Sequence, residues 1–329
     1  MFSTILSNPI LLGLVLVVGL VLLVKGADWL VDGASSLAKR LGVSDLMVGL
    51  TVVAFGTSMP EFVVNMVSVA DGATDLAITN ILGSNIINTL VILGCSALVC
   101  PLVAQRSTIR FDIPLNILAG VLVLLFVFIT SPMEARGLSR IEGLTLLVIF
   151  AGFLAYTLYT AKSDIQTTET SATFPIWKCV ILILLGLVGL VVGGEMIVKS
   201  AVAIARYAGV AESVIGLTIV ALGTSLPELA TSVVAAFKHN NDIAIGNVVG
   251  SNIFNVFFIL GTSALIRPLP SYEGVETDAL LVALSAALVW LLLVCSKKRT
   301  VNRWGGALLL LVYAAYLFFR LVGIGCCFI

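Results

Sequence analysis

Apolar runs of about 20 residues recur from one end of this chain to the other. A run of this length crosses the hydrocarbon core of a bilayer as one α-helix, and backbone inside that core must form helices or closed barrels. The chain is 60% hydrophobic and 11% charged, whereas a soluble domain carries roughly 25% charged residues. The sequence therefore predicts an all-α polytopic membrane protein.

Ten transmembrane helices are predicted, with boundaries good to about 2–4 residues. A polar segment, residues 162–175, separates the first five from the last five. The N-terminus lacks a basic stretch and a small-residue cleavage site, so it is predicted to be the first span rather than a signal peptide. The predicted spans are 9–31, 44–70, 75–100, 111–130, 141–161, 176–205, 211–237, 242–266, 276–295 and 304–322.

The distribution of Lys and Arg among the loops predicts the orientation, because cytoplasmic loops carry an excess of both. If the N-terminus lies outside, the inside loops hold eleven basic residues and the outside segments hold five. Both termini are therefore predicted to lie outside, and the 162–175 linker is predicted to be cytoplasmic.

The two halves align without gaps at a constant offset of 167 residues. Residues 49–61, GLTVVAFGTSMPE, match 216–228, GLTIVALGTSLPE, and the sequence GSNI recurs at 83–86 and 250–253. The identities include Gly, Pro, Thr, Ser, Asn and Glu, which lipid-facing helices do not need, so shared composition does not explain them. Five spans per repeat is an odd number, so the second repeat must enter the membrane from the opposite side. Such inverted five-helix repeats are typical of secondary transporters, whose sites lie near the bilayer midplane.

Glu61 and Glu228 occupy matching positions within these predicted spans. A charged carboxylate in hydrocarbon costs several kcal/mol unless it is paired or coordinated. One divalent cation would neutralise both glutamates. The alternative is that each glutamate pairs with a basic residue inside a span, for which Lys25 and Lys199 are the candidates.

The residues just before each glutamate predict a break in the helix. Pro60 and Pro227 leave the carbonyls of Gly56 and Gly223 without their usual partner. Irregular backbone at membrane depth is tolerated around a buried polar site, and an oxygen-only cluster suits hard cations such as Ca²⁺ or Na⁺. The nearby hydroxyls that lie on nearly the same helix face as a glutamate belong to Thr57, Ser58, Thr224 and Ser225.

The GSN blocks add neutral oxygens. Ser84 and Asn88 are four residues apart and share a helix face, as do Ser251 and Asn255. For Asn80 and Asn247, hydrogen bonding between helices is the preferred interpretation. Asp28 and Asp32 are expected to form interfacial salt bridges with Lys25.

Several other functions are disfavoured. The zero net charge gives no indication of a nucleic-acid partner, and the chain lacks a Walker A sequence and an intramembrane Ser–His pair. An ATP-driven pump and an enzyme are therefore disfavoured. The six cysteines are expected to be small lipid-compatible fillers.

These blocks resemble the sodium/calcium exchanger membrane family, within the cation/calcium exchanger superfamily, and its compact prokaryotic members most of all. The resemblance covers nearly the whole chain, as one repeat at 9–161 and another at 176–322. It implies a secondary antiporter of a prokaryotic plasma membrane that exchanges Ca²⁺ for Na⁺ and needs no cofactor. It also implies alternating access, in which the first and sixth spans slide across the other helices.

The resemblance further implies four cation sites around the two glutamates. Glu61 and Glu228, with the main-chain oxygens of Thr57 and Thr224, would hold Ca²⁺. The Na⁺ sites would share the glutamates and add the residues Ser58, Ser225, Ser84 and Ser251 and the carbonyls of Ala54 and Ala221.

One departure from the family pattern concerns the counter-ion. Some members carry aspartate at one or both of the positions of Asn88 and Asn255. With two asparagines the site holds at most two negative charges, so one Ca²⁺ leaves it neutral and three Na⁺ leave it positive. The number of Na⁺ ions therefore stays open, as do the alternatives of exchange for H⁺, additional K⁺ transport, and a passive cation channel.

Overall fold

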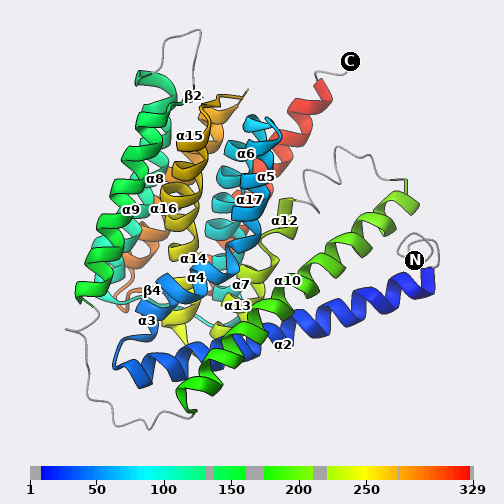
Figure 1. Ribbon diagram of the computed structural model, residues 1–329, viewed down its shortest axis with the longest axis vertical. Helices are drawn as coiled ribbons and strands as arrows, with labels where there is room; N and C mark the ends of the chain where they lie inside the picture. Colours follow the sequence, from blue (N-terminus) through cyan, green and yellow to red (C-terminus); the bar gives the residue numbers. More distant parts are fainter. Residues whose placement is uncertain (1–8, 131–136, 161–173, 210–220, 273, 327–329) are drawn as a thin grey trace.

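The computed structural model describes residues 9–130, 137–160, 174–209, 221–272 and 274–326. They are mostly α-helical. Two long helices, α2 (Pro9–Leu41) and α10 (Ile176–Tyr207), lie side by side along one edge of the molecule, and the remaining helices form a bundle next to them (Figure 1). The linker predicted at 162–175 lies almost wholly outside the described residues.

The first repeat continues after α2 with short helices and π-helical turns. In chain order they are α3 (Asp45–Val48), η1 (Gly49–Val53), α4 (Ala54–Thr57), α5 (Met59–Ala70), α6 (Thr74–Ile86), η2 (Ile87–Ile92), α7 (Leu93–Val99), η3 (Thr108–Asp112), α8 (Ile113–Leu125), η4 (Phe126–Thr130) and α9 (Arg140–Thr160).

Most described elements of the second repeat have a counterpart in the first at nearly the same offset, although the single helix α16 takes the place of η3, α8 and η4. α13 begins and ends 167 residues after α5, and α14 begins and ends 167 residues after α6. The turn between the two helices has a positive φ in both repeats, at Gly72 and at His239. After α10 the elements are α12 (Ala221–Gly223), α13 (Leu226–Phe237), α14 (Asn241–Ile253), η6 (Phe254–Leu260), α15 (Gly261–Ile266), α16 (Val275–Cys295) and α17 (Arg303–Cys326).

Two short antiparallel ribbons join the halves. β1 (Leu102–Val103) pairs with β4 (Thr300–Val301), and β2 (Gly137–Leu138) pairs with β3 (Leu269–Pro270). Each ribbon takes one strand from each repeat, so the two repeats form one intertwined bundle rather than two separate domains.

Seven helices of the described chain are long and apolar enough to cross a membrane, or eight if the bent pair Asp45–Thr57 and Met59–Ala70 is one span. Ten were predicted. The predicted span 211–237 begins outside the described residues, which contain only α12 and the 12-residue α13 of it. The predicted span 304–322 corresponds to α17, which is not among the seven.

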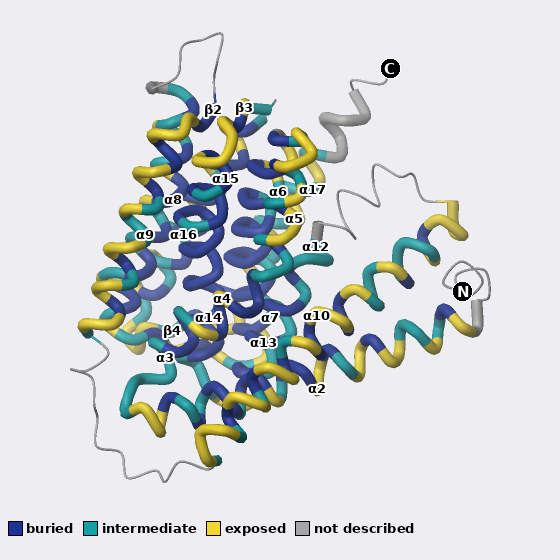
Figure 2. The backbone as a smooth tube through the Cα atoms, in the orientation of Figure 1, coloured by how far each residue is buried: buried dark blue, intermediate teal, exposed yellow. Residues whose placement is uncertain are grey.

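Burial differs sharply between the central and the peripheral helices (Figure 2). The apolar stretch within Asn241–Ile266 is 94% buried, whereas that within Leu11–Leu41 is 28% buried. Exposed Val and Leu side chains cover the outer faces of α2 and α10. Such apolar faces are what a helix presents to lipid, so the bundle core lies around α6 and α14.

Glycines bring α2 and α10 into close antiparallel contact. A Cβ on Gly26 would lie 2.8 Å from the Gly186 carbonyl oxygen, and a Cβ on Gly193 would lie 2.7 Å from the Gly19 carbonyl oxygen. Gly19 and Gly186 are repeat counterparts, as are Gly26 and Gly193. The contact is therefore self-complementary: exchanging the two halves of the chain reproduces it. Small residues of this kind allow two membrane helices to approach closely.

Replacing Gly26 with Val is expected to lower the thermal stability of the detergent-solubilised protein by about 1–3 kcal/mol, the usual cost of overpacking. The branched side chain would meet the α10 backbone, which cannot rotate away. Thermal unfolding measures the change. Gly152→Val in α9 is the matched control, because no described atom of a neighbouring element lies within 4 Å of its Cβ position. Equal stability of the two variants would contradict the prediction.

Candidate functional site

Two helix breaks lie at the centre of the bundle, one in each repeat. The backbone leaves the helical conformation at Ser58, with φ −83° and ψ 6°, and at Ser225, with φ −89° and ψ 5°. Pro60 and Pro227 then fall in the first turn of α5 and α13, where a missing N–H costs nothing. The helix break predicted before each glutamate is confirmed, and the first one bends its span by 45°.

Glu61 and Glu228 lie in the first turn after these breaks and are both fully buried. Ser58 Oγ donates a hydrogen bond to Glu228 Oε1 at 2.9 Å, and Ser225 Oγ donates one to Glu61 Oε1 at 3.4 Å. Each glutamate is thus held by a serine of the opposite repeat. The carboxyl groups are also close enough to repel one another when both are charged.

The alternative that a basic residue neutralises each glutamate finds no support in the described residues. Lys199 forms its salt bridge with Glu195 at 2.5 Å, four residues away on the exposed side of α10. No salt bridge found in the described part of the chain includes Glu61 or Glu228. The two carboxyl groups therefore lie in the core with only neutral polar groups and each other around them.

The four predicted side chains of the GSN blocks are also buried. Asn88 and Asn255 lie in the π-helical turns η2 and η6, and Ser84 and Ser251 lie one turn earlier, in α6 and α14. π-helical turns are frequent at functional sites. The four residues come from both repeats, so the structure brings the two GSN blocks together.

Several of these side chains have buried oxygens that take part in no hydrogen bond within the described structure. A buried acceptor without a partner is costly, so a cluster of them fits a positively charged ligand. The atoms include Glu61 Oε2, Glu228 Oε2, Ser84 Oγ, Asn88 Oδ1 and Asn255 Oδ1.

The predicted main-chain ligands lie at the same breaks. The carbonyl oxygen of Ala54 accepts the Ser58 amide at 3.0 Å and the Thr57 hydroxyl at 3.4 Å. The Thr224 hydroxyl oxygen is buried and has no hydrogen-bond partner within the described structure. Ala221 begins α12, directly after residues that lie outside the described chain.

Asn80 and Asn247 hydrogen-bond between helices, which was the preferred interpretation of both. Asn80 Nδ2 donates to Asn65 Oδ1 at 2.8 Å, and Asn247 Nδ2 donates to Ser232 Oγ at 2.9 Å. Asn247 has a second role that sequence reasoning missed, since its Oδ1 accepts the Thr57 hydroxyl at 3.0 Å. It thereby links the GTS block of the first repeat to the second repeat.

A second link between the repeats was also missed. Asn85 Nδ2 donates to the Asn252 carbonyl at 3.2 Å, and Asn255 Nδ2 donates to Asn85 Oδ1 at 3.1 Å. Asn252 in turn donates to Thr89 Oγ1 at 2.8 Å. The signal was present in the sequence, because Asn85 and Asn252 are repeat counterparts.

Comparisons with known proteins agree with this geometry. The family described as "Sodium/calcium exchanger protein" matches residues 11–159 and 178–322. The putative antiporter CaxA of Alkalimonas amylolytica is 38% identical over 91% of this chain and 95% of its own. The sodium/calcium exchanger MaX1 of Methanosarcina acetivorans is 31% identical over 92% of this chain and 97% of its own. A structure of the sodium-calcium exchanger NCX_Mj, soaked with Na⁺ and Sr²⁺, superimposes with a TM-score of 0.81 at 31% identity, covering 94% of this chain and 98% of that one.

Proposed function

The chain belongs to the sodium/calcium exchanger protein family, and from this we propose that it is a secondary antiporter that exchanges Ca²⁺ for Na⁺ by alternating access. It is an integral membrane protein of the transporter class, with Ca²⁺ and Na⁺ as its substrates. The named relatives that are antiporters or exchangers, and the exchanger structure that it resembles over 94% of its length, support the proposal.

The proposed topology is ten transmembrane helices in two inverted repeats, 9–161 and 176–322. The recurrence of α5–α6 as α13–α14 at one offset supports it, and so does the antiparallel packing of α2 on α10. We propose a plasma-membrane location with the 162–175 linker in the cytoplasm and both termini outside, and the excess of Lys and Arg in the inside loops supports this orientation.

The proposed binding site is the oxygen cluster around Glu61 and Glu228. The observation that carries the proposal is the buried pair of carboxyl groups, each hydrogen-bonded to a serine of the opposite repeat and lacking a basic partner in the described chain. One Ca²⁺ would cancel both charges, and the oxygens that have no other partner would coordinate it. Ca²⁺ would also bind the main-chain oxygens of Thr57 and Thr224, and Asn88 and Asn255 would add neutral oxygens to the cluster. Na⁺ would use the same glutamates with the oxygens of Ser58, Ser225, Ser84 and Ser251 and the carbonyls of Ala54 and Ala221.

The coupling ion is tested with purified protein in sealed vesicles. An outward Na⁺ gradient is expected to drive uptake of radioactive Ca²⁺, and collapsing that gradient is expected to stop the uptake. Uptake that follows a pH gradient and ignores Na⁺ would instead identify a Ca²⁺/H⁺ antiporter. Uptake that persists without any counter-ion gradient would identify a passive cation channel.

A further inference from the structure

Lys238 joins the bundle to the long helix α2 at one face of the molecule. It follows directly after α13, and its Nζ lies 2.5 Å from Asp28 Oδ1 and 2.6 Å from Asp32 Oδ1 on α2. Burial lowers the pKa of this ammonium group, but its hydrogen bonds to the two aspartates outweigh burial and raise the pKa above its ordinary value. The lysine is therefore charged. Salt bridges of Asp28 and Asp32 were predicted, but in the described structure their partner is Lys238 rather than the predicted Lys25.

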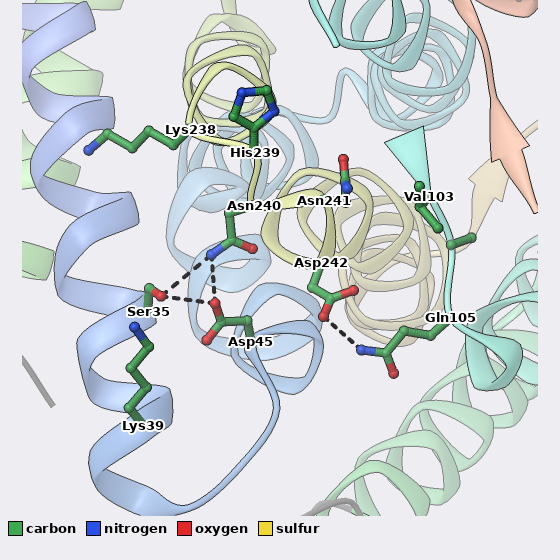
Figure 3. A pocket seen from close by; sticks show the side chains of 11 residues that line it. Ser35, Lys39, Asp45, Val103, Gln105, Lys238, His239, Asn240, Asn241 and Asp242 are labelled. Carbon is green, nitrogen blue, oxygen red and sulfur yellow. Dashed lines mark hydrogen bonds between the residues drawn. The ribbon is translucent and has the colours of Figure 1, made fainter. Parts of the chain in front are cut away.

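The same face holds further contacts of α2 with the start of α14. Figure 3 shows Lys238 pointing toward α2, and Asn240 pointing toward Ser35 and Asp45. Asn240 Nδ2 donates to Asp45 Oδ2 at 2.6 Å, and Ser35 Oγ donates to the same oxygen at 2.9 Å. These groups line a cavity of about 550 Å³. With the proposed topology this is the cytoplasmic face, and these contacts hold α2 against the bundle there.

The opposite face lacks the corresponding contact. α2 packs closely on α13, yet the repeat counterparts of these two helices, α10 and α5, make at most marginal contact within the described chain. Within the described residues, the packing of the α2–α10 pair on the bundle is therefore asymmetric: α2 packs on α13 without an equivalent packing of α10 on α5.

The residues at that opposite face mirror the Lys238 cluster. Adding or subtracting the offset of 167 takes Lys238 to Asp71, Asp28 to Glu195 and Asp32 to Lys199. Each set contains one lysine and two carboxylates, with the lysine on the bundle in one set and on the long helix α10 in the other. Asp71 is exposed just after α5, and Lys199 lies four residues after Glu195 on α10.

We propose that these two clusters are alternating latches: Lys238 with Asp28 and Asp32 holds the state seen here, and Lys199 with Asp71 and Glu195 holds the opposite state. The proposal rests on the proposed function, because it requires the α2–α10 pair to shift from one face to the other. In the opposite state, α10 packs on α5 in the way that α2 packs on α13 here. Lys199 on α10 then reaches Asp71 at the end of α5. The salt bridge then closes the outer face, while Lys238 releases α2.

The experiment uses cysteine pairs in a full-length variant without native cysteines, reconstituted in vesicles. D32C/K238C and D71C/K199C are each treated with a short, cleavable thiol cross-linker. Each pair is expected to form its cross-link when it is present alone. Each cross-link is expected to reduce exchange at least about tenfold until the linker is cleaved, because it fixes one end state. In the quadruple variant, the two cross-links are expected to exclude each other on one molecule.

Absence of a 71–199 cross-link, or both cross-links on the same molecule, would overturn the proposal. A variant lacking native cysteines that does not exchange Ca²⁺ for Na⁺ would count against the proposed function instead. The mutual exclusion of the two cross-links needs no transport, so it tests the latches independently.

Charge reversal gives a second test. Lys199→Asp and Asp71→Lys are each expected to shift the exchange rate about fivefold, the effect of losing a salt bridge worth about 1 kcal/mol. The double variant D71K/K199D restores the opposite charges and is expected to recover most of the rate. Lys297→Asp, an exposed lysine outside both clusters, is the control and is expected to be neutral. If D71K/K199D exchanges no faster than either single variant, the proposed latch of Lys199 with Asp71 and Glu195 is overturned.

Discussion

Replacing Glu228 with Gln is expected to reduce Na⁺-driven Ca²⁺ uptake at least about 100-fold. The reason is that removing one partner of a buried charge pair, here the carboxylate that would bind Ca²⁺, costs several kcal/mol. The variant keeps the side-chain volume and the acceptor for Ser58 but removes one of the two charges that would neutralise Ca²⁺. Glu61→Gln is expected to behave in the same way. Uptake into vesicles containing either variant measures the loss.

Stability distinguishes a lost ligand from a lost fold. Without Ca²⁺, either glutamine variant is expected to be at least as thermally stable as the wild type, because the two buried carboxyl groups no longer repel one another. Addition of Ca²⁺ is expected to raise the melting temperature of the wild type and not that of the variant. Glu276→Gln, an exposed glutamate in the first turn of α16, is the control for both measurements. Robust Ca²⁺ uptake by Glu228→Gln would remove this glutamate from the site.

Replacing Gly250 with Ala is expected to reduce exchange at least about tenfold and to lower stability by about 1–3 kcal/mol, as overpacking does. The added Cβ would lie 2.7 Å from the Leu50 carbonyl oxygen and 2.8 Å from the Ala54 Cβ. Leu50 and Ala54 precede the break at Ser58, so the strain is relieved only by moving the segment that carries Thr57 and Ser58.

The control for Gly250 is a glycine with open surroundings. Gly152→Ala in α9 has no described atom of another element within 4 Å of the new Cβ, and it is expected to leave exchange and stability unchanged. Vesicle uptake and thermal unfolding are measured on both variants. If Gly250→Ala transports normally, the close packing of α14 on η1 is not needed for the site.

Residue types and spacing were enough to predict the helix breaks. A proline one residue before a glutamate, in two matching places, has few structural interpretations, and the breaks lie at Ser58 and Ser225. The convergence of Glu61 and Glu228 was predicted from the inverted repeat alone. The serine hydrogen bonds between repeats are consistent with it.

The partners that a side chain finds on another helix could not be predicted in the same way. The predicted partner of Asp28 was Lys25, which lies three residues away on the same helix, where side chains are neighbours in any fold. Its observed partner, Lys238, is 210 positions away in the chain and meets it only because α13 packs on α2. Asn247 was missed as a partner of Thr57 for the same reason, since periodicity says which face is buried but not what covers it.

The glycine contact between α2 and α10 is symmetric, because the repeat relation maps it onto itself. Because exchanging the halves of the chain returns the same contact, it would contribute equal energy at both extremes of the proposed helix movement. Any bias between the extremes must come from positions where the repeats differ, such as Lys238 and Asp71. In the proposed antiporter the glycine contact would therefore set no direction of net exchange, which would follow from the ion concentrations on the two sides.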